Sequence, residues 1–137
     1  MSKLSKSGID GYGCPYLVIT ETGNYSVYKT FDCGQCFRFD PVSDPRHGYA
    51  VAGVAHGKYI KIAQDEPGSV TVYGITDDEY YTFFCRYLAL DTDYDEIDRV
   101  IAAALPENSA ERAYICACIE SSRGIRILAQ EPWETLC

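Results

Sequence analysis

The apolar residues of this 137-residue chain change their spacing partway along the sequence. Up to about residue 74 they occur in short β-branched or alternating runs, separated by segments rich in Gly, Pro, Asn and Asp, which is typical of strands. From residue 76 onward they recur every three or four positions, which is typical of amphipathic helices. Strands followed by a separate set of helices predict an α+β domain, with an antiparallel twisted sheet packed on helices.

The first half predicts about five short strands. Their expected ranges are 16–20, 36–40, 49–54, 58–63 and 70–74. A short hairpin turn is expected at His56 and Gly57. Within 58–63, the alternation of a strand puts Lys61 on one face and both Ile60 and Ile62 on the other.

The second half predicts three helices, at 76–90, 91–106 and 108–124. Thr76 and Glu79 have the spacing of a capping box, which satisfies free backbone N–H groups at a helix start. Pro106 is expected to end the second helix, and Asn108 to cap the third. A further helix is expected to begin near Pro132.

The charge of the chain limits the partners that it can bind alone. The sequence holds 20 acidic and 12 basic residues, for a net charge of −8. Because DNA binding draws much of its affinity from Lys and Arg, we expect the chain alone to bind DNA weakly. The N-terminus lacks the apolar stretch of a signal peptide, and no apolar run is long enough to span a membrane. These features predict a cytoplasmic protein, associated with the nucleoid if bacterial.

The segment TFDCGQCFRF, residues 30–39, carries a CxxC pair that allows three interpretations. A tetrahedral zinc site needs a second pair of ligands, and the sequence offers none at a suitable spacing. A redox pair is expected at the start of a helix, whereas this pair leads into a predicted strand. The third interpretation is a backbone turn with Cys33 and Cys36 as packing residues, and Cys85, Cys116 and Cys118 are also expected to be buried.

The same segment resembles the N-terminal signature of the 8-oxoguanine DNA glycosylase family. Three further blocks resemble later parts of that family's N-terminal domain in the same order. They are GYAVAGVAHGKYIKI, YYTFFCRYLALDTDYDEI and GIRILAQEPWETLC. The resemblance implies a TBP-like α+β domain over residues 1–130. It also implies that residues 131–137 begin a helical catalytic domain that follows.

In this family the helical domain contains a helix-hairpin-helix and carries a lysine nucleophile and an aspartate. The lysine displaces the damaged base, forms a Schiff base with the sugar and allows strand cleavage, after the nucleotide has been flipped out of the duplex. No residue of the present chain matches that lysine or aspartate, and Lys58 and Lys61 lie in a strand pattern. The resemblance therefore implies that this chain is part of a DNA-repair glycosylase and lyase. It also implies that the present chain carries no catalytic residue, metal or cofactor.

The resemblance implies substrate-binding roles for Gly34, Gln35 and Phe37. The Gly34 carbonyl would read the lesion, because 8-oxoguanine carries a hydrogen at N7 where guanine has a bare acceptor. Gln35, Phe37 and Arg38 would hold the turn in place, with a salt bridge or the domain interface as the other role for Arg38. Trp133 would anchor this domain to the helical one.

The implied partners are double-stranded DNA containing 8-oxoguanine, bound through the full-length protein, and the C-terminal helix-hairpin-helix domain. Self-association through the PWETLC end, including a disulfide of Cys137, is also expected if that end is uncovered. Two alternatives from other classes stay open. One is a stand-alone TBP-like module that binds DNA or protein without catalysis, and the other is a metal-bound or thiol-active protein that uses Cys33 and Cys36.

Overall fold

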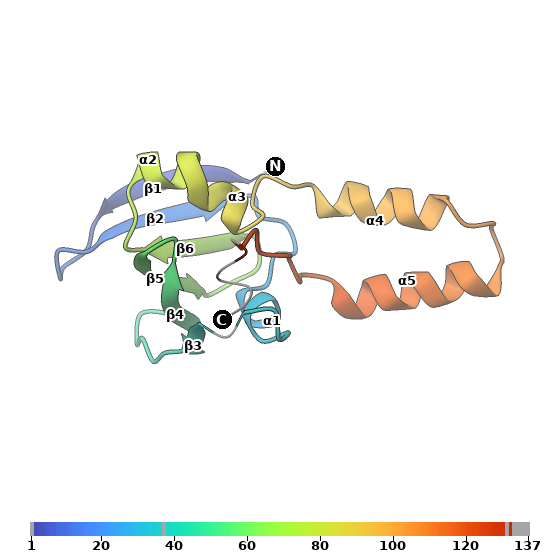
Figure 1. Ribbon diagram of the computed structural model, residues 1–137, viewed down its shortest axis with the longest axis horizontal. Helices are drawn as coiled ribbons and strands as arrows, with labels where there is room; N and C mark the ends of the chain where they lie inside the picture. Colours follow the sequence, from blue (N-terminus) through green and yellow to red (C-terminus); the bar gives the residue numbers. More distant parts are fainter. Residues whose placement is uncertain (1, 37, 131, 133–137) are drawn as a thin grey trace. The chain divides into compact units, whose positions relative to one another are not determined.

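The computed structural model describes residues 2–36, 38–130 and 132, which form two compact units (Figure 1). The first unit contains the described residues up to Asp91 and from Gly124 onward. The second unit is Thr92–Arg123. The predicted boundary at residue 131 lies at the edge of the described residues, so that division stays a prediction.

The first unit is built on one antiparallel sheet, which confirms the predicted α+β class. Within the described residues the strand order is β1-β2-β6-β5-β4-β3, and every neighbouring pair is antiparallel. The strands are β1 (Lys3–Ile9), β2 (Pro15–Thr20), β3 (Phe39–Pro41), β4 (Tyr49–Ala55), β5 (Lys58–Gln64) and β6 (Ser69–Tyr73).

The two faces of the sheet carry different side chains. One face holds the main core, in which Leu17 of β2, Ile62 of β5 and Val72 of β6 are at most 1% exposed. The opposite face carries a smaller cluster of Ala50, Ala63 and Tyr73. The predicted alternation of β5 is confirmed, because Ile60 and Ile62 lie in the core while Ala63 lies in the other cluster.

A continuous helical segment packs on the core face of the sheet (Figure 1). It consists of α2 (Asp77–Glu79), the π-helical η1 (Tyr80–Phe84) and α3 (Cys85–Tyr87). The predicted capping box is confirmed: the Glu79 N–H donates to Thr76 Oγ1 over 3.4 Å, and the Thr76 N–H donates to Glu79 Oε1 over 3.1 Å. Tyr80 and Phe84 are buried, and burial raises the pKa of the Tyr80 phenol.

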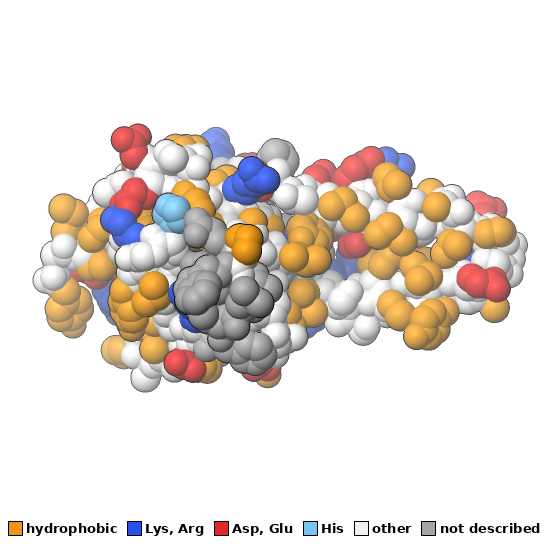
Figure 2. Space-filling view, in the orientation of Figure 1, with side chains coloured by type: hydrophobic (Ala, Val, Ile, Leu, Met, Phe, Trp, Pro, Cys, Tyr) orange, Lys and Arg blue, Asp and Glu red, His pale blue; other side chains and the backbone are white. Residues whose placement is uncertain are grey.

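The second unit is a hairpin of α4 (Tyr94–Ala103) and α5 (Ala110–Ser122). Asp93 is the N-cap of α4, and the first turn carries the acidic residues Asp95 and Glu96. Neither helix has a buried residue, and Figure 2 shows apolar side chains along both. The exposed apolar residues include Ile97, Val100, Ile101 and Tyr114. Within the described part of the chain, no helix has the length and apolar character needed to cross a membrane.

Several local predictions are corrected by the structure. The strand expected at 36–40 begins only at Phe39, because residues 32–36 form a loop after α1 (Val27–Phe31), a five-residue helix too short for its period to show in the sequence. The edge strand β1 was not expected, since only Leu4 packs against the core. Ser109, not Asn108, caps α5: Asn108 adopts a φ of +59°, and Ser109 Oγ accepts from the Arg112 N–H over 3.1 Å.

Candidate functional site

The loop between α1 and β3 presents an exposed backbone at Gly34. Gly34 adopts a φ of +83°, a conformation that glycine enters without the steric cost that other residues incur. A Cβ built at Gly34 would meet nothing within 4 Å. Among the hydrogen bonds between described residues, none has the Gly34 carbonyl as its acceptor. Within the described part of the chain, this carbonyl therefore has no partner that would compete with a ligand.

Gln35 fastens the loop to two other segments of the chain. Its Nε2 donates to the carbonyl of Thr30 over 2.9 Å and to that of Arg126 over 2.6 Å. Its Oε1 accepts from the Leu128 N–H over 3.0 Å. Since both amide hydrogens are used within the chain, the side chain of Gln35 holds the loop in place, as expected. A direct contact between this side chain and a substrate stays a prediction.

Thr30 and Arg126 extend this network and were not identified from the sequence. Thr30 is fully buried, and its Oγ1 donates to the Gly124 carbonyl over 3.3 Å and accepts from the Arg126 N–H over 3.1 Å. Arg126 is buried and donates to Asn24 Oδ1 over 2.7 Å. About 95 residues separate the two partners in the sequence, so no local pattern could have paired them.

A shallow hollow of about 280 Å³ lies beside Gly34. Its apolar lining includes Phe31 and Phe39, whose ring centroids are 4.8 Å apart, and its rim carries the carboxylates of Asp32 and Asp40. Tyr49 also lines it, and burial, followed by the nearby charge of Asp32, raises the pKa of this phenol. An apolar floor accepts a flat ring, whereas the acidic rim repels a phosphate.

The cysteines do not form a site in the described part of the chain. Cys36 is buried, while Cys33 is exposed and its Sγ lies 3.3 Å from the Thr30 carbonyl. Among the described residues, no group of three or more His, Cys, Asp or Glu side chains could hold a metal ion. The packing role expected for Cys33 is wrong, and so is the burial expected for Cys116 and Cys118. Both helical cysteines are exposed, because neither α4 nor α5 buries any residue.

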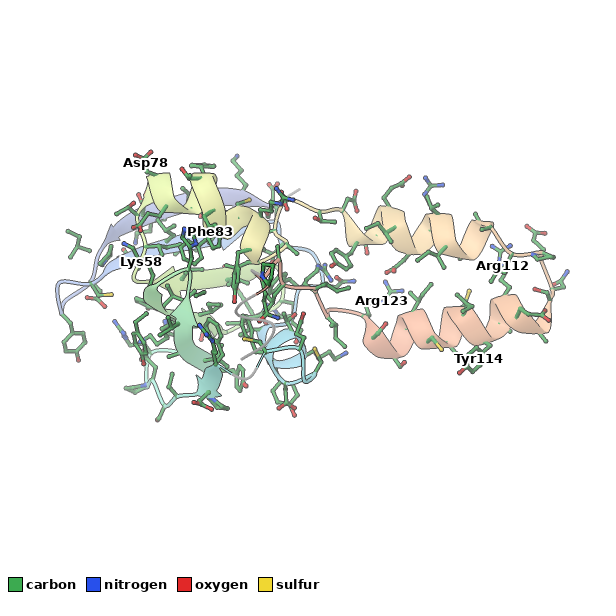
Figure 3. The ribbon with its side chains drawn as sticks, in the orientation of Figure 1. Lys58, Asp78, Phe83, Arg112, Tyr114 and Arg123 are labelled. Atoms are coloured by element: carbon green, nitrogen blue, oxygen red, sulfur yellow. The ribbon has the colours of Figure 1, made fainter. Side chains whose placement is uncertain are left out.

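The two lysines that the sequence excluded as nucleophiles are both ion-paired. Lys58, which lies on β5 (Figure 3), pairs with Glu79. Lys61 Nζ lies 2.5 Å from Asp44 Oδ2.

A second cluster of charges lies on the outer face of the sheet, around a hollow of about 370 Å³. The Asp44 side chain is only 5% exposed and accepts hydrogen bonds from both Arg46 and Lys61. These bonds, with that to Arg46 the stronger influence, hold the pKa of Asp44 well below its usual range. The guanidinium of Arg46 and the ammonium of Lys61 lie 4.9 and 4.4 Å from the Tyr73 ring centroid. The cluster fastens the loop before β4 to the sheet.

Other predicted site residues cannot be described in the same way. Phe37, Trp133 and Cys137 lie outside the described residues, so their expected roles stay predictions. Arg38 is half-buried and has no carboxylate partner among the residues that the structure describes. The carbonyl of Arg38 instead lies against Gly53 of β4.

Comparison with known proteins extends over almost the whole chain. Residues 17–136 match the family model described as 8-oxoguanine DNA glycosylase, N-terminal domain. No curated protein matches the chain.

Three similar solved structures share the fold. The apo form of the Clostridium acetobutylicum 8-oxoguanine glycosylase/lyase is 25% identical, with a TM-score of 0.71, over 98% of this chain and 40% of that one. The same enzyme with double-stranded DNA containing cytosine opposite 8-oxoG is 23% identical, with a TM-score of 0.73, over 95% and 39%. MBOgg1 in complex with a low affinity DNA ligand is 22% identical, with a TM-score of 0.77, over 99% and 40%.

The chain thus spans about 40% of the length of these similar structures. The family model covers 17–136, a range that holds most of β2, the strands β3 to β6, the helices and the loop that carries Gly34, whereas β1 precedes it. This chain therefore belongs to the family of 8-oxoguanine DNA glycosylase N-terminal domains.

Proposed function

We propose that this chain is the N-terminal domain of a base-excision-repair glycosylase and AP lyase that removes 8-oxoguanine from double-stranded DNA. The match to the family model and the fold shared with DNA-bound relatives support the proposal. The catalytic lysine and aspartate would lie in a helix-hairpin-helix domain that follows this one. The protein would act in the cytoplasm, or at the nucleoid of a bacterium.

The observation that carries the proposal is the carbonyl of the exposed residue Gly34, which accepts no hydrogen bond from another described residue. 8-Oxoguanine presents an N–H at N7, which can donate to this carbonyl, whereas guanine presents a lone pair that repels it. Leaving a buried polar group without a partner costs about 1–3 kcal/mol. That difference corresponds to a preference of about five- to a hundredfold.

The surface charge fits a domain that depends on a second one for DNA affinity. The net charge is −8, and Asp32 and Asp40 border the hollow beside Gly34. Lys and Arg that neutralise phosphates supply most of the affinity of non-specific DNA binding. The DNA backbone would therefore be held mainly by the helical domain, while this domain contributes contacts to the base.

Borohydride trapping on a duplex containing 8-oxoguanine tests the division of labour. Borohydride reduces the Schiff base between a lysine and the sugar, which leaves a covalent adduct. We expect an adduct with the gene product that extends past Cys137, and none with residues 1–137. An adduct with residues 1–137 would mean that one of their lysines is the nucleophile. No adduct with either protein would favour a binding module without catalysis.

Gly34→Ala in the full-length protein tests the lesion contact. The substitution strains a backbone with φ of +83° and adds a methyl group beside the carbonyl, so the preference for 8-oxoguanine over guanine should fall. Gly13→Ala is the matched control, because Gly13 has a φ of +79° and equally open surroundings. Equal preferences in both variants would contradict the proposed contact.

A further inference from the structure

The side chains of Gln35 and Gln130 each form hydrogen bonds with the backbone of the segment that contains the other residue. Gln130 Nε2 donates to the Gln35 carbonyl over 2.7 Å. In return, the Gln35 side chain bonds the backbone of Arg126 and Leu128, in the same segment as Gln130. Both glutamines are half-buried. These reciprocal bonds, here called the glutamine latch, join the loop after α1 to residues 126–130.

The latch acts on the peptide group that carries the Gly34 carbonyl through the Cα of Gln35. That peptide group ends at the Cα of Gln35, and Gly34 on its other side offers little resistance to rotation. Three side-chain hydrogen bonds and the bond from Gln130 fix the position of Gln35. The direction of the Gly34 carbonyl therefore depends on how firmly Gln35 is held.

Resting on the proposed function, we propose that Gln130 is a positioning residue for lesion recognition. Its side chain comes from outside the loop and donates a hydrogen bond to the main chain of Gln35. Gln130 does not touch the base in this proposal. It stops the Gln35 peptide groups from reorienting, so that the Gly34 carbonyl faces the base before binding. Losing this one hydrogen bond lets the loop sample other directions, which weakens recognition of 8-oxoguanine.

The test uses the full-length protein with Gln130→Met, which removes the donor and retains the length of the side chain. A second variant, Gln130→Glu, keeps the shape but turns an acceptor toward the Gln35 carbonyl. Two quantities are measured: kcat/KM on a duplex with 8-oxoguanine, and the inhibition constant of an undamaged duplex as competitor. We expect kcat/KM to fall about fivefold with Met, the effect of one hydrogen bond of typical net strength. Glu should reduce it at least as much, and the inhibition constant should stay unchanged.

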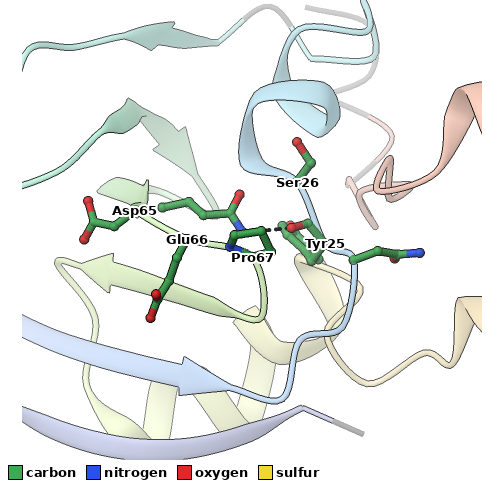
Figure 4. Close-up of a pocket in the computed structure, with 7 residues that line it drawn as sticks. Tyr25, Ser26, Asp65, Glu66 and Pro67 are labelled. Carbon is green, nitrogen blue, oxygen red and sulfur yellow. Dashed lines mark hydrogen bonds between the residues drawn. The ribbon is translucent and has the colours of Figure 1, made fainter.

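Gln64→Met is the matched control. The Gln64 side chain also bridges backbone groups, accepting from the Val27 N–H over 2.9 Å and donating to the Tyr25 carbonyl over 2.8 Å. These contacts lie at a pocket lined by Tyr25 and Ser26, before α1, and by Pro67 in the turn between β5 and β6 (Figure 4). The substitution removes the same chemical group from the end of β5, away from the loop that carries Gly34. We therefore expect it to lower stability while preserving kcat/KM.

The outcomes distinguish failure of the proposed function from failure of the positioning role of Gln130. A wild-type protein that fails to excise 8-oxoguanine overturns the proposed function, and the role of Gln130 with it. If wild-type excision is normal, an unchanged kcat/KM in both Gln130 variants overturns the positioning role alone. An equal fall in the Gln64 and Gln130 variants also overturns it, because general loss of stability would then explain both results.

Discussion

Gly53 is the position where the sheet has least room for a side chain. It pairs with Phe39 across β4 and β3. A Cβ built there would lie 2.1 Å from the Arg38 carbonyl oxygen, 2.8 Å from its carbon and 2.9 Å from the Phe39 Cα. All three atoms belong to the backbone, so no side chain can rotate away. Gly53→Ala must therefore push the edge strand β3 off its ladder.

The cost of this displacement follows from the contacts that it removes. Overpacking of a filled site costs about 1–3 kcal/mol. Each hydrogen bond lost from the short β3 ladder adds about 1 kcal/mol. We therefore expect Gly53→Ala to lower the free energy of unfolding by about 2–4 kcal/mol, out of the ~5–15 kcal/mol usual for a domain. Phe39, which is 5% exposed in the core, should become more accessible.

Urea unfolding followed by far-ultraviolet circular dichroism measures this difference. Gly48→Ala is the control, because a Cβ at Gly48 has its nearest neighbours at 3.8 Å, an ordinary van der Waals contact. Its free energy of unfolding should stay within about 0.5 kcal/mol of wild type, as at most surface positions. If Gly53→Ala were as stable as Gly48→Ala, the argument that close backbone approach requires glycine here would be refuted.

Two further substitutions test the outer charge cluster and the start of α2. Because the folded-state pKa of Asp44 is lowered, its stabilising effect is present above about pH 4 and is lost as the pH falls below that value. Asp44→Asn should therefore reduce the loss of stability between neutral and acidic pH in urea titrations, and an unchanged pH dependence would contradict this. Thr76→Ala removes the N-cap that accepts from the Glu79 N–H and should cost about 1 kcal/mol by the same assay. No measurable loss would mean that the capping box contributes nothing to stability.

The elements with clear periodicity could be predicted from the sequence. The strands β2, β4, β5 and β6 lie within one or two residues of their expected ranges, because each is a short run of β-branched or alternating apolar residues bounded by turn residues. The capping box at Thr76 was also recognisable, since its partners are three residues apart. Segments without such a pattern were missed. One of them is β1, an edge strand that pairs with β2 through backbone hydrogen bonds.

The candidate site divides in the same way. The motif at residues 30–39 was visible in the sequence, and it directed attention to Gly34. Which groups hold Gly34 in place was not visible, because the pairs Thr30 with Arg126 and Gln35 with Gln130 are each about 95 residues apart in the sequence. The role of Gly53 was equally hidden, since the closest neighbours of a Cβ there are backbone atoms of Arg38 and Phe39, 14 or 15 residues earlier.

The α+β class, the core face of β5 and the family signature around Gly34 could be recognised from the residues alone. Those properties follow from local spacing and residue type, which are contained in the amino-acid sequence. The hydrogen-bond partners of the Gly34 carbonyl and of the Gln35 side chain among the described residues became known only from the folded structure. The same holds for which cysteines are exposed. Hydrogen-bond partners and burial depend on distances between segments far apart in the chain, and those distances exist only once the sheet has formed.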